Sequence, residues 1–76
     1  MNKSRRAEIT KIAGQLSDIK DSLEQIREDE QDSIDNMPEN FQLGERGEKS
    51  AEGVDAIEDA LQALDDIGTA LETAAE

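Results

Sequence analysis

Six large aliphatic residues in the first third of the chain recur at intervals of three and four, and no other feature restricts the fold as strongly. They are Ile9, Ile12, Leu16, Ile19, Leu23 and Ile26. This is the a/d pattern of a heptad repeat, which places all of them on one side of an α-helix. Asn2 or Ser4 can cap the start of this helix, and Pro38 disfavours helical geometry at the residue before it. We therefore expect a helix over residues 3–35.

A second apolar stripe follows after a turn. Its a and d positions are Val54, Ile57, Leu61, Leu64, Gly68, Leu71 and Ala75. Alanines beside these positions make this stripe wider than the first. The intervening residues include Asn36, Pro38 and Gly44, which are typical of turns. The sequence predicts a single all-α domain over 1–76, an antiparallel, coiled-coil-like helical hairpin with a helix over 3–35, a turn over 36–44 and a helix over 45–75.

The two stripes can be aligned, because facing residues in an antiparallel pair have residue numbers with a constant sum. A sum of 80 gives six layers, five of them wholly apolar, and Leu23 then faces Ile57. This alignment centres the turn on Asn40 and brings the e positions of the two helices together. The ion pairs expected at e positions are Lys20 with Glu58 and Arg6 with Glu72.

Three glycines lie inside the expected helices: Gly14, Gly53 and Gly68. Gly68 occupies an a position, where the missing side chain permits a close approach of the two helices. The role of the other two stays open.

A hairpin with a single seam leaves apolar edges exposed, and helix pairs of this size are marginally stable alone. The width of the second stripe indicates that its helix contacts two neighbours, although the helical preference of alanine is an alternative explanation. We expect a homodimer in which two hairpins form a four-helix bundle. The residues assigned to self-association are Val54, Ile57, Ala60, Leu61, Leu64, Ile67 and Leu71.

The charge is strongly negative and unevenly distributed. The chain has 20 acidic and 8 basic residues, a net charge of −12, and no positive charge follows Lys49. Such a chain is repelled by nucleic acid and by anionic membranes. It has no apolar stretch of the ~18 residues that a membrane span needs, and its basic start is not followed by the apolar run of a signal peptide. We expect a cytoplasmic protein whose partner is another protein, with no direct binding to nucleic acid or membrane.

Catalytic groups are scarce, since the chain contains no His and no Cys. Zinc sites of the ordinary type, thiol nucleophiles and imidazole bases are therefore excluded. Glu45 with Glu48 and Glu52 with Asp55 have the spacing by which all-helical pyrophosphatases hold magnesium. Such spacings arise by chance in an acidic chain, and neither apolar stripe carries inward carboxylates. We expect no enzymatic activity, no catalytic or metal site and no cofactor.

Eleven acidic residues are candidates for a partner-binding acidic face. They are Glu28, Asp29, Asp32, Asp35, Glu39, Glu45, Glu48, Glu52, Asp55, Asp59 and Asp66. Like charges three and four residues apart destabilise a helix, so structural demands alone favour some lysine among residues 50–76. A partner with a basic surface supplies the missing charge. Two interpretations have equal weight: the carboxylates bind such a partner, or they only keep the protein soluble.

The turn contains three large apolar residues, Met37, Phe41 and Leu43. The interpretation that we prefer is a simple cap, in which they fold over Ile34 at the end of the core. The alternative is an apolar anchor at the tip that docks into a partner.

The central run Asn36-Met37-Pro38-Glu39-Asn40, followed by Gly44-Glu45-Arg46-Gly47-Glu48, carries a family resemblance. It resembles small acidic proteins encoded in phages and prophages of low-GC Gram-positive bacteria, in which two heptad-bearing helices flank a similar connection. The similarity covers most of the chain. It implies a phage protein in the cytoplasm of a bacterial host cell, and it implies no particular activity.

Three functional hypotheses follow. The first is a non-enzymatic acidic binding protein, a phage-encoded inhibitor and nucleic-acid mimic that blocks the basic surface of a host nucleic-acid-binding or defence protein. The second is a structural or assembly module whose helices pair with a phage or replication protein, its acidity serving solubility. The third, a carboxylate–metal enzyme, is the weakest. Binding that weakens steeply with salt distinguishes the first from the second.

Overall fold

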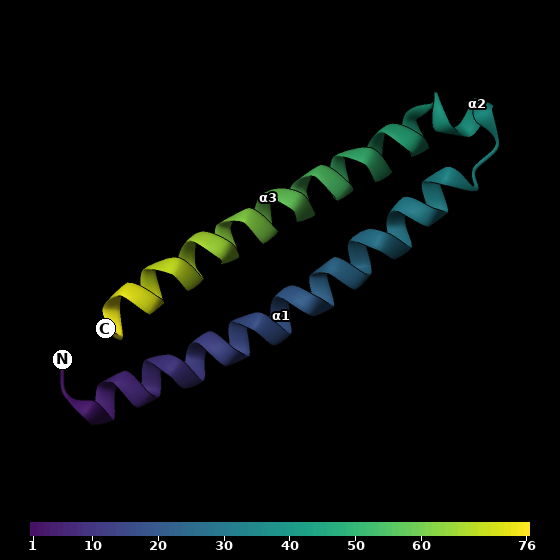
Figure 1. Ribbon diagram of the computed structural model, residues 1–76. Coiled ribbons are helices and arrows are strands. Elements are labelled where there is room, and N and C mark those ends of the chain that lie inside the picture. The colour runs from purple at the N-terminus through teal and green to yellow at the C-terminus, as the bar shows by residue number, and fades with distance from the viewer.

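The chain forms an all-helical hairpin, and the computed structural model describes residues 1–76. Helix α1 spans Lys3–Asp35, the short helix α2 spans Glu39–Gln42, and helix α3 spans Glu45–Ala74. α1 and α3 run antiparallel, and α2 lies where they are joined, so both termini lie at the opposite end (Figure 1). The molecule is a rod of 58 × 15 × 11 Å. Neither long helix has an apolar stretch of the kind that crosses a membrane.

The two long helices begin in different ways. At the start of α1 the side chain of Asn2 accepts a hydrogen bond of 2.8 Å from the backbone N–H of Arg5, so Asn2, rather than Ser4, is the cap. At the start of α3 the preceding residue is Gly44, which has an extended backbone and no side chain to cap the helix. Glu45 and Glu48 lie in the first turn of α3, where negative charge is favourable for the helix dipole.

Each long helix has a seam of less exposed residues spaced by three and four. On α3 these residues are Gly47, Ser50, Val54, Ile57, Leu61, Leu64, Gly68, Leu71 and Ala75. This is the expected a/d stripe. On α1 they are Ile9, Ala13, Leu16, Lys20, Leu23, Arg27, Glu30 and Ile34. The a and e positions of α1 therefore face α3, and its d positions lie to one side of the contact between the two helices.

The alignment of the two seams differs from the expected one. The less exposed residues of the two helices match one for one when their numbers add up to 84, which sets Leu23 opposite Leu61. The lining of a groove beside the seam agrees, because it contains Lys20 next to Leu64 and Asp65. The expected sum of 80 is thus wrong by four residues, which corresponds to about 6 Å along a helix.

The rotation of α1 decides which apolar residues are buried. Val54 and Leu61 of α3 are the only buried hydrophobic residues, each 6% exposed. In contrast, Ile12, Ile19 and Ile26 of α1 are 47%, 49% and 52% exposed. In place of these d residues, α1 brings the aliphatic stems of Lys20 and Arg27 to the seam, which long basic side chains can do while their charges stay in water.

The joint between α2 and α3 explains the shifted alignment. The side chain of Gln42 donates hydrogen bonds to the backbone oxygens of Ile34 and Met37, at 2.9 and 3.0 Å. Gly47, in the first turn of α3, is buried, and a Cβ there would lie 2.7 Å from the Cα and the carbonyl carbon of Gln42 and still closer to its carbonyl oxygen. α3 thus starts directly against Gln42, which is also the centre implied by a sum of 84. The expected centre at Asn40 did not allow for the extra helical turn of α2.

The three glycines within the long helices occupy open positions. A Cβ at Gly14, Gly53 or Gly68 would meet nothing within 4 Å. The close helix approach expected at Gly68 is therefore wrong, and the glycine with a packing role is Gly47.

Candidate partner-binding surfaces

The outer side of α3 carries a straight line of carboxylates. Four of them recur every seven residues and define what we call the α3 ridge: Glu45, Glu52, Asp59 and Asp66. Seven residues make nearly two helical turns, so neighbouring members lie about 10 Å apart on one side of the helix. All four are exposed, and they occupy the f position, which points away from α1 when a and d face it.

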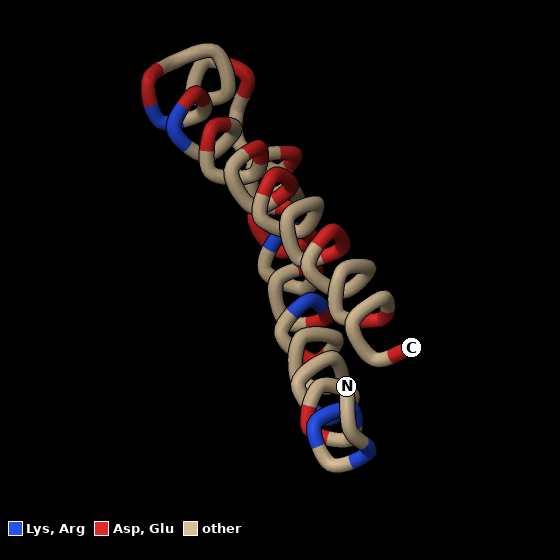
Figure 2. The backbone as a smooth tube through the Cα atoms, turned by 90° about the vertical axis from the view of Figure 1, so that its left-hand side faces the viewer, with Lys and Arg blue, Asp and Glu red and all other residues tan.

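Two more carboxylates, Glu48 and Asp55, lie beside the α3 ridge and are also exposed. The one cation paired with this group is Lys49, whose Nζ is 3.4 Å from an oxygen of Glu45, both side chains being at least three-quarters exposed. Such a surface pair contributes little. Figure 2 shows acidic segments along the helix that leads to the C-terminus, with basic segments on α1 and near the turn. The α3 ridge is therefore largely without counter-charge.

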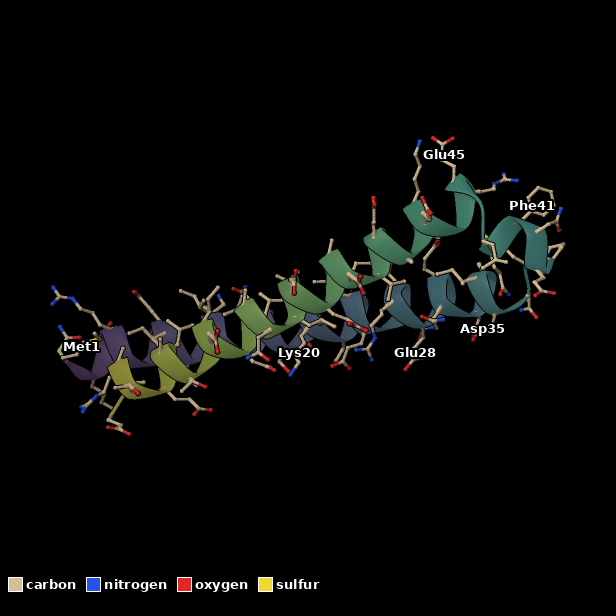
Figure 3. The ribbon with its side chains drawn as sticks, turned by 90° about the horizontal axis from the view of Figure 1, so that it is seen from above. Met1, Lys20, Glu28, Asp35, Phe41 and Glu45 are labelled. Atoms are coloured by element: carbon tan, nitrogen blue, oxygen red, sulfur yellow. The ribbon has the colours of Figure 1, made fainter.

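The remaining candidate carboxylates form a second group, the α1 edge. Its members are Glu28, Asp29, Asp32, Asp35 and Glu39, all exposed. Two of them accept hydrogen bonds from glutamines one helical turn away: Asp29 from Gln25 at 2.9 Å and Asp35 from Gln31 at 3.0 Å. Glu28 and Asp35 project on the side of the rod opposite to Glu45 (Figure 3). The eleven acidic candidates therefore do not all lie on one side of the rod.

One flank of the hairpin is charged across the seam. Lys20 of α1 forms an ion pair and hydrogen bond with Asp65 of α3. The hydrogen bond with Asp65 raises the pKa of Lys20 above its usual 10.5, partial burial opposes this shift, and the charge of Asp65 adds to it. The two helices thus meet e position to e position, as expected, but Lys20 pairs with Asp65 and not with Glu58. No ion pair joins Arg6 to Glu72.

The tip of the hairpin exposes apolar side chains. Phe41 is 46% exposed and Leu43 is 76% exposed, whereas Met37 and Ile34 are half-buried. The ring of Phe41 projects from the end of the rod (Figure 3). The exposure of Phe41 and Leu43 is contrary to the preferred interpretation of a simple cap, and for Met37 that interpretation stays a prediction.

The residues assigned to self-association fall into two groups. Val54, Ile57, Leu61, Leu64 and Leu71 lie on the seam with α1 of the same chain. Ala60 and Ile67 are exposed. The side chains available to a second copy are these two and the d-position isoleucines of α1, whose exposure the heptad pattern alone did not reveal.

At the open end, a shallow groove lies between the two helices. It is lined by the apolar side chains of Ile9, Ala13, Leu71 and Ala75, with Thr10, Glu72 and Glu76 around them. No group of three or more acidic side chains is placed to hold a metal ion.

Comparison of the chain with protein-family models, with curated proteins and with solved structures finds no match.

Proposed function

We propose that the chain is a non-enzymatic acidic binding protein, encoded by a phage, that inhibits a nucleic-acid-binding or defence protein of the bacterial host by covering its basic surface. The observation that carries this proposal is the α3 ridge, a line of exposed carboxylates with almost no counter-charge. The phage origin depends on the resemblance of the turn sequence, and the host cytoplasm is the compartment that it implies.

The spacing of the carboxylates on α3 suits a surface that binds phosphates. The α3 ridge and its neighbours Glu48 and Asp55 place a carboxylate every three or four residues from Glu45 to Asp59, the first half of the helix, or about one per 5 Å. One strand of DNA has a phosphate about every 3.4 Å along the helix axis, which is the same order of charge density. A protein that needs only solubility can use charges of both signs, and α3 has no positive charge after Lys49.

The tip supplies a contact of a different kind. Charge complementarity contributes mostly to partner selection and association rate, whereas buried aromatic and aliphatic side chains contribute much of the binding energy in protein interfaces. Phe41 and Leu43, exposed between the α1 edge and the start of α3, are the side chains that we assign as the anchor.

Two copies form a four-helix bundle in this proposal. The hairpin buries only two hydrophobic residues, too few for a stable small domain by itself. Pairing covers the exposed isoleucines of α1 and leaves both α3 ridges on the outside of the bundle.

The test is affinity capture from a bacterial lysate on immobilised wild-type protein, with elution in rising salt and identification by mass spectrometry. We expect a basic nucleic-acid-handling or defence protein that is released at moderate salt, because exposed ion pairs are screened. Duplex DNA or RNA added to the column must then compete with its capture. A captured protein that resists high salt and ignores nucleic acid contradicts the proposal.

Two variants with equal charge changes locate the binding surface. The ridge variant neutralises the α3 ridge by Glu45→Gln, Glu52→Gln, Asp59→Asn and Asp66→Asn. The control variant neutralises four carboxylates of α1 by Glu8→Gln, Asp18→Asn, Asp21→Asn and Glu24→Gln. We expect the ridge variant to release its partner at lower salt than the control. Equal elution of the two means that net charge, and not the α3 ridge, drives capture.

A structural or assembly module is the second candidate. The observation that favours it is the exposed row of isoleucines on α1, which a helix of a phage or replication protein can cover. Such binding persists at high salt and is abolished by Ile19→Asp but not by the ridge variant. Changes at Leu61 or Leu64 are less informative, because both residues lie on the seam of the hairpin itself.

A further inference from the structure

One flank of the hairpin carries no charge at the d positions of α1 from Ile12 to Ile26 or at the g and c positions of α3 from Gly53 onward. The ion pair between Lys20 and Asp65 shows that the e positions of both helices lie on the opposite flank. The d positions of α1 and the g and c positions of α3 therefore share a side in an antiparallel pair. We call this side the isoleucine flank. It consists of Ile12, Ile19, Ile26, Ala56, Ala60, Ala63, Ile67, Ala70 and Ala74, all exposed.

The two halves of the isoleucine flank differ in side-chain size. The α1 half presents one isoleucine every seven residues, each about half exposed. The α3 half presents alanines at the same period, with one large residue, Ile67. Since facing residue numbers add up to 84, each isoleucine is level with a pair of these α3 positions. The three levels are Ile26 with Ala56 and Ala60, Ile19 with Ala63 and Ile67, and Ile12 with Ala70 and Ala74.

We infer that a second copy of this chain docks on the isoleucine flank, with the two-fold axis parallel to the helices, so that α1 of each copy packs on α3 of the other. This inference rests on the pairing of two copies proposed above and adds the face and the orientation. Rotation about an axis parallel to the helices leaves each residue at the same height along the rod, so the levels of the two copies coincide. Ile19 of one copy then meets Ala63 and Ile67 of the other, and large side chains face mostly small ones at all three levels.

The other two-fold arrangement places α1 on α1 and α3 on α3. Isoleucines would then meet isoleucines, and alanines would meet alanines. The distance between packed helices depends on the side chains at the contact. In this arrangement the two α1 helices would therefore lie further apart than the two α3 helices. The arrangement with α1 on α3 gives two equal contacts, which favours it.

Charge and area agree with a second copy as the occupant. Two chains that each carry a net charge of −12 repel each other, so they approach most easily through an uncharged side. Neither the c nor the g positions of α3 from Gly53 onward carry a charge. One side of the rod measures 58 × 15 Å, an outline of the same order as the roughly 800 Å² that each partner contributes to a standard interface, and the three uncharged levels span about 21 Å of its length.

The experiment compares two variants of equal charge by light scattering after size exclusion, at micromolar concentration. Ile19→Asp places a charge on the isoleucine flank, and Ser17→Asp places one on the exposed opposite flank of the same helix. We expect the wild type and Ser17→Asp to have twice the chain mass of 8.3 kDa, and Ile19→Asp to have half the mass of the wild type. A monomeric wild type overturns both the pairing and the face. A dimeric, helical Ile19→Asp overturns the face alone.

Cysteine pairing tests the orientation and does not require a charged variant to fold. The chain has no cysteine, so introduced thiols react without background. We expect a mixture of Ile19→Cys and Ala63→Cys chains to form the mixed disulfide on oxidation, because a disulfide requires Cα atoms within about 7 Å. Efficient cross-linking of Ile19→Cys with itself, without the mixed product, overturns the orientation with α1 on α3.

Discussion

The two long helices carry apolar stripes of similar length, but they use them differently. α3 turns its a and d residues to α1, and Val54 and Leu61 become buried. α1 has no buried residue, and it turns its d-position isoleucines to one side. The comparison teaches that a heptad pattern identifies the apolar side of a helix but does not determine which neighbour that side meets.

The difference between the helices has a local cause at the joint. α2 and Gln42 fix where α3 begins, and the contact at Gly47 holds that position. α1 then meets α3 four residues further along than apolar matching alone suggests. With this alignment the e position of α1 faces the seam, which brings Lys20 to Asp65.

The largest effect on stability is expected from alanine substitutions that compare the apolar stripe of α3 with that of α1. Leu61→Ala removes a side chain that is 6% exposed, whereas Ile19→Ala removes one that is 49% exposed. We expect Leu61→Ala to lower the free energy of unfolding by about 2–3 kcal/mol and Ile19→Ala to lower it by about 1 kcal/mol or less. Urea denaturation followed by circular dichroism measures both, at the lowest practical concentration, where association contributes least. Equal losses would mean that the stripes are equally buried.

The next effect separates the glycine at the joint from a glycine in the open. Gly47→Ala places a methyl group against the backbone of Gln42, and we expect it to lower stability by about 1–2 kcal/mol. The matched change Gly53→Ala meets no atom within 4 Å, so we expect a gain of about 0.5–1 kcal/mol from helix propensity. Opposite shifts of the urea midpoint confirm the distinction. If both variants gain stability, the joint between α2 and α3 can accommodate an alanine side chain at position 47.

A smaller effect compares the two helix starts. Asn2→Ala removes the acceptor for the N–H of Arg5, and we expect a loss of about 1 kcal/mol. The control is Ser4→Ala, because Ser4 was the other candidate cap and its change should leave stability within about 0.5 kcal/mol. Thermal unfolding of the two variants, measured side by side, decides between the caps. A loss at Ser4 as large as that at Asn2 would refute the assignment.

The smallest effect concerns the pair that joins the helices on the charged flank. Lys20→Met keeps the aliphatic stem and removes the charge, so we expect a small loss of stability that shrinks with added salt. Asp65 raises the pKa of Lys20 above 10.5 in the folded chain. The folded state therefore holds this proton more tightly, and the stabilisation is present below pH 10.5 and lost as the pH rises through the raised pKa. The difference in free energy of unfolding between wild type and variant should be constant near neutral pH and should disappear above pH 10.5. If this difference persists above pH 10.5, the ion pair is not its source.

The sequence predicted what depends on periodicity. The extent of the long helices, the all-α hairpin, the a/d side of α3 and a cap at either Asn2 or Ser4 all follow from local patterns. The exposure of the acidic candidates also follows, since carboxylates at f and neighbouring positions point outward.

What the sequence did not predict depends on single contacts. The fit of Gly47 against Gln42 has no periodic signal, yet it shifts the alignment by four residues and so changes the partner of Lys20. The exposure of Leu43 likewise depends on how α2 is placed at the tip. The side of the rod on which Glu28 and Asp35 lie, opposite to Glu45, depends on the rotation of α1 about its axis.

The position of both termini at one end of the rod has a mechanical consequence (Figure 1). A force that pulls the two ends of the chain apart acts across the seam and not along it. The levels then separate one after another, beginning with Ile9 and Ala75 and finishing with Ile34 and Ser50. Each step opposes the force with a single level of contacts, so the hairpin unzips at low force and the joint at Gly47 opens last.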